Sequence, residues 1–301
     1  MQLRHIGEIK VRNKEHIAIT VPLCYSNYIR MTAMSKLKHT FKTDVLFKML
    51  FTKYPGSLKQ LTAHLLRIPV SSIGEFKVES PEMPPDGVGD KFCRLDILMT
   101  IDGQKVNLEI QVEDEGDFPE RTLFYWARIY SNSLRTGKDY IHLPRTIIIS
   151  ILDFTLFKGH NEYHSEFQLL EVTRHHRLTD KMLLHFFELP KLPEIADKDN
   201  LLHLWLSLFK AETREDLKMI EDMGVTEINE IVTAYHKLAQ SPEFREMERQ
   251  REKTQMNEAS ALRNEREKTE KRLNKKWKGI VADKDAEIKK LRRQLADLNG
   301  V

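Results

Sequence analysis

The spacing of apolar residues predicts helices in the first half of the chain. The stretch TDVLFKMLFTKY, which begins at Thr43, places its apolar residues at helical intervals and predicts a helix with Thr43 or Asp44 as its cap. A second helix is expected at 57–67. FPERTLFYWARIYSNSLRTG predicts a third helix, because Pro119 lies near its start and Gly137 lies just past its end.

Strand-like stretches alternate with these helices. RTIIISILDFTLF is typical of a buried strand, YHSEFQLLEV and MLLHFFELP predict further strands, and HIAITVPLCY near the start predicts a short one. Because strands and helices alternate through residue 190, the pattern favours an α/β sheet with helices on its faces. After Lys191 the strand pattern stops, and NLLHLWLSLFKAET and the stretch up to Ala239 predict helices.

The chain beyond Pro242 has no further proline and follows a coiled-coil pattern. An alternating spacing of four and three residues marks the seam of a coiled coil. The seam positions are Asn274, Trp277, Val281, Lys284, Ile288, Leu291, Leu295 and Leu298. We expect this tail to pair either with the same tail of a second chain, as a homodimer, or with residues 200–240 of its own chain.

Residues 94–115, RLDILMTIDGQKVNLEIQVEDE, predict a β-hairpin that carries charged side chains on its strands. Asp102 and Gly103 are a strong signal for a two-residue turn, so Ile101 is expected to pair with Gln104. Extending this register along both strands fixes which side chains share a face.

In this register Asp96 lies directly across from Glu109, and Gln111 lies two residues farther along the same face, opposite Arg94. The opposite face is expected to carry Leu95, Ile97, Ile110 and Val112. Opposed side chains have Cβ atoms about 5 Å apart, where like charges are destabilising. Either one carboxylate has a raised pKa, or a cation lies between the two. Two carboxylates with a backbone carbonyl and water suit Mg²⁺ or Mn²⁺.

Two other interpretations of the pair are open. The face is solvent-exposed and the charges are screened, with Arg94 as a partner, or the pair belongs to a glycosidase, whose carboxylates lie about 5 Å apart in retaining enzymes. The glycosidase interpretation explains neither Gln111 nor the absence of an aromatic sugar platform beside the hairpin.

Composition narrows the class of protein. Apolar residues make up 41% of the 301 positions, which is enough for a sizeable core, and no apolar run is long enough to cross a membrane. Cys24 and Cys93 are the only cysteines, so neither a metal knuckle nor a disulfide framework is expected and a reducing, cytoplasmic setting is favoured.

Charge is distributed unevenly. From Glu243 onward there are 17 Lys and Arg against 12 Asp and Glu, a net of +5, whereas the preceding part holds 31 and 33, a net of −2. A basic tail either holds nucleic acid non-specifically or is a solvated helix of mixed charge.

Several stretches together resemble the recombination-promoting nuclease / transposase family, which has a PD-(D/E)XK nuclease core. They run in order from about Thr43 to Lys191 and include DVLFKMLF, PEMPPDGVGDKFCRLDIL, NLEIQV, ERTLFYWARIYSNSL, GKDYIHLPRTIIISILDFTLF, YHSEFQLLE and LTDKMLLHFFELPK. The resemblance implies a restriction-endonuclease-like mixed sheet flanked by helices and Mg²⁺- or Mn²⁺-dependent cleavage of DNA.

The resemblance also implies roles for four residues of this chain. Asp96 and Glu109 match the metal-binding acids, and Gln111 stands where many of the superfamily carry lysine. Asp44 matches an acid of the family's opening motif and is expected to reach the metal directly or through water, or else to be a first-turn aspartate favoured by the helix dipole. Lys48 is expected to meet a phosphate or to pair with Asp44.

Arg121, Tyr125 and Arg128 share one helix face and match family positions. They are expected either to line a DNA groove or to tie the helix to the sheet. A catalytically silent DNA-binding or assembly protein on the same fold remains the alternative, because Gln111 supplies no positive charge.

The expected domains cover the whole chain. They are an N-terminal extension at 1–38, a nuclease domain at 39–192, a helical region at 193–242 and a charged coiled-coil tail at 243–301. Because 1–33 lack clear periodicity, we expect that segment to be dispensable and Met34 to be a natural start.

Overall fold

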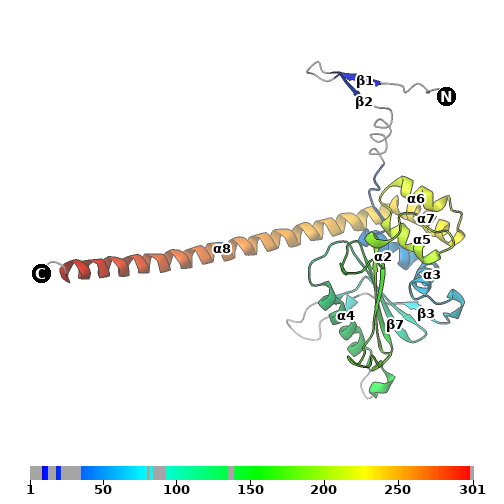
Figure 1. The fold of residues 1–301 in the computed structure, drawn as a ribbon, viewed down its shortest axis with the longest axis horizontal. Coiled ribbons are helices and arrows are strands. Elements are labelled where there is room, and N and C mark those ends of the chain that lie inside the picture. The colour runs from blue at the N-terminus through cyan, green and yellow to red at the C-terminus, as the bar shows by residue number, and fades with distance from the viewer. Residues whose placement is uncertain are drawn as a thin grey trace. The chain divides into compact units, whose positions relative to one another are not determined.

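The computed structural model describes residues 9–12, 18–21, 35–79, 82–83, 93–134 and 139–298. Two compact units divide the chain, residues 1–244 and residues 245–301. The first unit is built on a mixed sheet flanked by helices, and Figure 1 shows the sheet with α4 on one side. Within the described residues no helix is both long and apolar enough to cross a membrane.

The central sheet has six strands in the order β3-β6-β7-β8-β10-β9. Its strands are β3 (Phe76–Val78), β6 (Ile97–Ile101), β7 (Gln104–Gln111), β8 (Thr146–Leu152), β9 (His164–Phe167) and β10 (Met182–Glu188). The three central strands β7, β8 and β10 run parallel, and the outer pairs are antiparallel. Every residue of β8 and β10 is buried, which explains why both read as continuous apolar runs.

The first core covers one face of the sheet. It joins side chains of β6, β7, β8 and β10 to the helices, which are α2 (Asp44–Lys53), α3 (Pro55–Leu65), α5 (Leu201–Lys210), α6 (Arg214–Glu221) and α7 (Thr226–Ala239). Phe47 and Phe51 of α2 both pack on Phe209 of α5, with ring centroids 6.0 and 6.2 Å apart. The helices at 201–239 therefore share one core with the sheet and fix the position of α2.

The second core covers the opposite face. Helix α4 (Phe118–Asn132) packs there through Phe118 and Ile129 against residues such as Ile148 and Phe186. Short 3₁₀ turns lie at Val70–Ser72, Tyr140–His142 and Leu189–Lys191. The sheet is thus a middle layer with apolar side chains on both faces.

Most expected elements are confirmed. The helices expected from Thr43, at 57–67 and from Phe118, and the strands expected in the three apolar runs, all occur. Thr43 is the N-cap residue of α2 but makes no side-chain cap bond. The sequence patterns do not predict the short strand β3, and Gly137 and most of the stretch PEMPPDGVGDK lie outside the described residues.

The hairpin register is confirmed where the strands pair. Ile101 pairs with Gln104 and Ile97 pairs with Leu108, so the turn lies at Asp102 and Gly103. Asp102 has φ 47° and Gly103 φ 78°, the left-handed conformations that such a turn requires.

Two details of the expected register are wrong, because the chain bends at Asp96 just before β6 begins. Leu95 lies in the second core instead of on the face of Ile97 and Ile110, which are in the first core. Arg94 belongs to β5 (Cys93–Arg94), which pairs with β4 (Glu82–Met83), so it is not the strand partner of Gln111.

The remaining elements lie outside this sheet. Strands β1 (Ile9–Arg12) and β2 (Ala18–Val21) pair with each other, and β2 is the short strand expected in HIAITVPLCY. Helix α8 (Pro242–Leu298) includes all the expected seam positions. Taken by itself, this helix exposes its side chains from Glu252 to Leu295.

Candidate active site

The two carboxylates of the hairpin meet where β6 begins and β7 nears its end. The backbone N–H of Asp96 donates to Glu109 Oε1 at 3.2 Å. In return, the N–H of Ile110 donates to Asp96 Oδ2 at 2.9 Å. Each acid is thus held by the backbone of the other strand, and the bend at Asp96 turns its carboxylate toward β7.

Glu109 is a buried acid on the face of the second core. Only 7% of the residue is exposed, and Asn107 Nδ2 donates to its Oε1 at 2.7 Å. Burial, and next the charge of Asp96, raise the pKa of Glu109 to about 8, while the Asn107 bond, the Asp96 N–H and the nearby ammonium of Lys48 act in the opposite direction. Glu109 therefore holds a proton near neutral pH unless another cation approaches.

Two polar atoms beside Glu109 are buried and lack a hydrogen-bond partner. Ser150 lies opposite Glu109 on β8, and its Oγ is one of them. The other is Oδ1 of Asn107, whose amide nitrogen already holds the glutamate. Buried polar groups of this kind normally bind water or a ligand. The interior beside Glu109 therefore has oxygen donors that the protein itself does not use.

A lysine from the first helix compensates the charge of the acids. Lys48 Nζ lies 2.7 Å from Asp44 Oδ1 and 2.9 Å from Asp96 Oδ1. Asp44 and Lys48 are one turn apart on α2, while the intervening residues Val45, Leu46 and Phe47 are buried in the first core. The packing of α2 therefore directs this polar pair toward Asp96.

Gln111 ends β7, on the same face as Glu109 because the two are separated by two positions. Its side chain is half-buried, and Nε2 donates to the backbone carbonyl of Glu113 at 3.2 Å. The amide of Gln111 is thus engaged locally at the end of β7.

A second ion-paired cluster adjoins the end of β7. The N–H of Asp153 donates to the carbonyl of Gln111 at 2.9 Å. Lys42, which is buried, contacts Asp153 Oδ2 at 2.5 Å and Glu212 Oε1 at 3.3 Å. These contacts link the chain before α2 to the ends of β7 and β8, so they support the site from outside.

The predicted DNA-binding residues Arg121, Tyr125 and Arg128 all lie on α4. Arg121 Nη1 bonds Glu115 Oε2 at 2.5 Å, and its guanidinium lies 5.2 Å from the centre of the Phe118 ring. Tyr125 packs against the second core. The Tyr125 contact fits a helix face tied to the sheet, whereas the contacts of Arg121 are local, and a role in binding DNA stays a prediction.

The sequence interpretation did not include Asn107, Ser150, Lys42 or Asp153. Three of them carried a signal: Asn107 precedes Glu109 by two positions, Ser150 interrupts an apolar strand, and Asp153 directly follows that strand. Lys42 carried none, because its partners are distant in the sequence.

The oxygen donors at this site suit a divalent cation only if other ligands complete its coordination. In the described part of the chain, no group of three His, Cys, Asp or Glu side chains is placed to hold a metal ion. Asp44 contacts Lys48 rather than completing such a group. Asp96 and Glu109 remain as two adjacent carboxylates beside unused buried oxygens, which fits an oxygen-liganded ion completed by carbonyl, water or substrate oxygens.

Comparison with protein families identifies a related family. A family model described as PD-(D/E)XK nuclease family transposase matches residues 41–265. The match therefore includes the sheet, the acids of the hairpin, the helices at 201–239 and the beginning of α8. No curated protein and no solved structure matches the chain significantly.

Proposed function

The chain belongs to the PD-(D/E)XK nuclease family transposases, and from this premise we propose that it is a metal-dependent endonuclease that hydrolyses phosphodiester bonds of DNA. The observation that carries the proposal is the mutual contact of Asp96 and Glu109, a buried acid beside a second carboxylate. A raised carboxyl pKa caused by burial and a like charge is a common feature of functional sites.

Asp96 and Glu109 would hold Mg²⁺ or Mn²⁺. When bound, the ion lowers the pKa of a water ligand and neutralises negative charge that develops on the phosphate oxygens. Asn107 holds the carboxylate of Glu109 in position through its amide. In hydrolysis the water oxygen bonds to phosphorus, one P–O ester bond breaks, and the products are a phosphate monoester and a hydroxyl.

Lys48 supplies the positive charge that Gln111 does not. Its ammonium contacts Asp96 directly and reaches the site from α2 instead of from the strand. In our proposal, Lys48 compensates the charge of Asp96 and lies near the phosphate, and Gln111 orients the attacking water by hydrogen bonds. Asp44 positions Lys48 through their contact one helical turn apart.

DNA contacts beyond the reacting phosphate are assigned to α4 and to the tail. Arg121 and Arg128 would contact phosphates, and Tyr125 would stack on a base or sugar. The apolar seam of α8 would pair with the seam of a second chain, and the resulting homodimer would present two active sites to two strands.

Cleavage of a supercoiled plasmid tests the proposal. The full chain should nick or linearise the plasmid in Mg²⁺ and be inactive in EDTA. Asp96→Asn, purified in parallel, should lose several orders of magnitude of cleavage, and Asp180→Asn, which changes an exposed aspartate, should not. Equal cleavage by Asp96→Asn and the parent would contradict the proposal.

A second candidate is a DNA-binding or assembly protein that keeps the fold without turnover. The uncharged Gln111 and the basic tail favour it. In that case the full chain should bind DNA with a strong dependence on salt and show no EDTA-sensitive cleavage. Such a result would replace the endonuclease proposal.

A further inference from the structure

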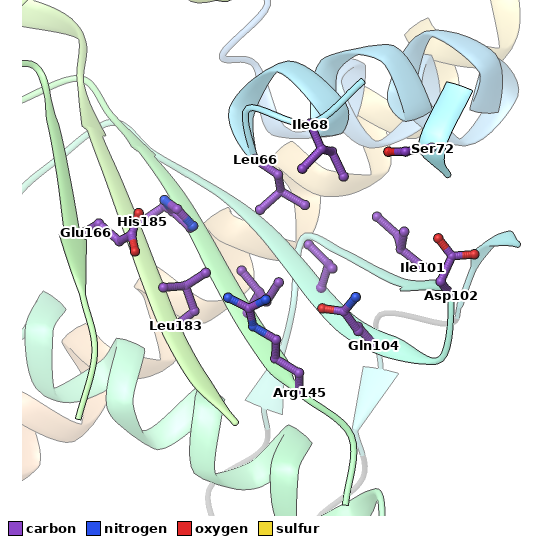
Figure 2. Close-up of a pocket in the computed structure, with 12 residues that line it drawn as sticks. Leu66, Ile68, Ser72, Ile101, Asp102, Gln104, Arg145, Glu166, Leu183 and His185 are labelled. Carbon is purple, nitrogen blue, oxygen red and sulfur yellow. The ribbon is translucent and has the colours of Figure 1, made fainter. Parts of the chain in front are cut away.

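A pocket of about 370 Å³ lies over the first-core face of the sheet. Its lining includes the end of α3, the turn of the β6–β7 hairpin, and the strands β8, β9 and β10 (Figure 2). The apolar part of the wall consists of Leu66, Ile68, Ile101, Val106, Ile147 and Leu183. The volume lies at the lower end of the range for small-molecule sites.

The pocket is separate from the acidic site. Val106 faces the pocket, whereas Glu109 points to the opposite face of the sheet because it is an odd number of positions away. Gln104 at the start of β7 lines the pocket, and the five residues from there to Glu109 span about 17 Å of strand. A ligand in this pocket would therefore not touch the acids.

Two basic side chains in the pocket have unused hydrogen-bonding atoms. His185 is 4% exposed, and its Nε2 is buried without a partner. Arg145 has a buried Nε without a partner, and its guanidinium forms no ion pair with any described carboxylate. Figure 2 shows both side chains on the sheet face that the pocket covers. A buried donor without a hydrogen-bond partner destabilises the folded state, and a ligand that accepts from it removes this desolvation penalty.

The acids of the pocket already have partners. Asp102 accepts the backbone N–H groups of Gly74 and Glu75, at 3.1 and 2.7 Å. Glu166 on the rim accepts from Gln168 Nε2 at 2.6 Å. Among the described residues that line this pocket, Arg145 is thus the charged group that has no charged partner. Its guanidinium can therefore bind an anion.

The imidazole of His185 can serve such an anion as a donor. Burial, and next the positive charge of His164, lower the pKa of His185 to about 4, so the ring is neutral at pH 7. His164 Nε2 and His185 Nδ1 lie 2.9 Å apart and share one hydrogen bond. When His164 donates in that bond, the proton of His185 is on Nε2, which then donates to a ligand.

We propose that this pocket binds a small organic carboxylate with an apolar body. The carboxylate would bond to the guanidinium of Arg145 and accept from His185 Nε2, and the apolar body would lie against the wall that Leu66, Ile147 and Leu183 form with their neighbours. An organic carboxylate fits better than a bare inorganic anion, because six of the twelve residues that line the pocket are apolar. It also fits better than a neutral amide, because Arg145 needs a charge.

Isothermal titration of the full chain with 2-naphthoate tests the proposal. 2-Naphthoate should bind saturably. 2-Naphthamide and inorganic phosphate should bind about tenfold more weakly or not at all, because the amide lacks the negative charge and phosphate lacks the apolar body. Equal affinity for the naphthoate and the amide, or no saturable binding of 2-naphthoate, would overturn the proposal.

Variants locate the binding. Arg145→Gln should weaken 2-naphthoate about tenfold or more, and His185→Phe, which keeps a ring to stack beside Phe187, should weaken it several-fold. Arg177→Gln, at an exposed arginine that does not line the pocket, should bind like the parent. Melting temperatures confirm that each variant is folded. Unchanged affinity in folded Arg145→Gln would place the ligand elsewhere and overturn the proposal.

Discussion

Replacing Glu109 by glutamine should remove a pH dependence of stability. In the parent, the pKa of Glu109 is raised from 4.5 to about 8, chiefly by burial and by the charge of Asp96. The folded chain therefore binds this proton more tightly than the unfolded chain does. The resulting stability is fully present below the unfolded pKa of 4.5 and is lost as pH rises through 8.

The size of this loss of stability follows from the interval between the two pKa values. Each pH unit between the two pKa values changes the free energy of unfolding by at most about 1.4 kcal/mol. Between pH 5.5 and 7.5 the parent should therefore lose up to about 2.5 kcal/mol through this group. Readjustment of Lys48 and Asp96 reduces the value. The glutamine side chain of the variant does not titrate and keeps the contacts to Asn107 and to the Asp96 N–H, so Glu109→Gln should lack this loss.

Urea unfolding in EDTA at the two pH values measures the difference. Trp277→Phe in both backgrounds removes the tryptophan of the tail, which leaves Trp126 and the fully buried Trp205 as reporters of the first unit. Mg²⁺ should then stabilise the parent at pH 7.5 and not the Glu109→Gln variant, because only a native state that binds the ion is stabilised by it. Equal pH slopes in the two proteins, or equal stabilisation by Mg²⁺, would show that Glu109 neither titrates in this range nor binds the ion.

Three further predictions concern Lys48, the tail and the N-terminal segment. Lys48→Met leaves Asp44 and Asp96 without their shared cation, so the free energy of unfolding measured in urea should fall by about 1–2 kcal/mol and most of the cleavage should be lost. Adding Gln111→Lys to this variant should restore part of the cleavage, and no recovery would contradict the proposed role of Lys48. Light scattering should give a dimer for the full chain and a monomer for a chain that ends at Ser241, and equal monomer masses would exclude dimerisation through the tail. A chain that begins at Met34 should melt and cleave like the full chain, because β2 pairs with β1 rather than with the central sheet, and a large fall in melting temperature would contradict this.

The sequence was sufficient to predict the hairpin and most of the elements because their patterns are local. The Asp-Gly turn sets the register from Ile101–Gln104 to Ile97–Leu108, and this register brings Asp96 to Glu109. Apolar periodicity likewise predicted α2 and β8. By contrast, the bend at Asp96 depends on the packing of Leu95 in the second core, which no local pattern encodes.

The surroundings of the acids could be predicted only in part. The contact of Lys48 with Asp96 joins positions far apart in the sequence and depends on how α5 and α7 hold α2 against the sheet. The pairing of Lys42 with Asp153 spans 111 residues. Such contacts come from tertiary packing, so spacing along the chain identified the acids but not the cations that compensate them.

Anomalous diffraction from crystals soaked in Mn²⁺ shows directly whether Asp96 and Glu109 bind a divalent ion. We expect a single strong peak in each active site, bound by the carboxylates of Asp96 and Glu109, and its loss in crystals of Asp96→Asn grown and soaked in the same way. A peak bound by other residues, or a peak that persists unchanged in Asp96→Asn, would contradict the claim that these two acids hold the catalytic ion.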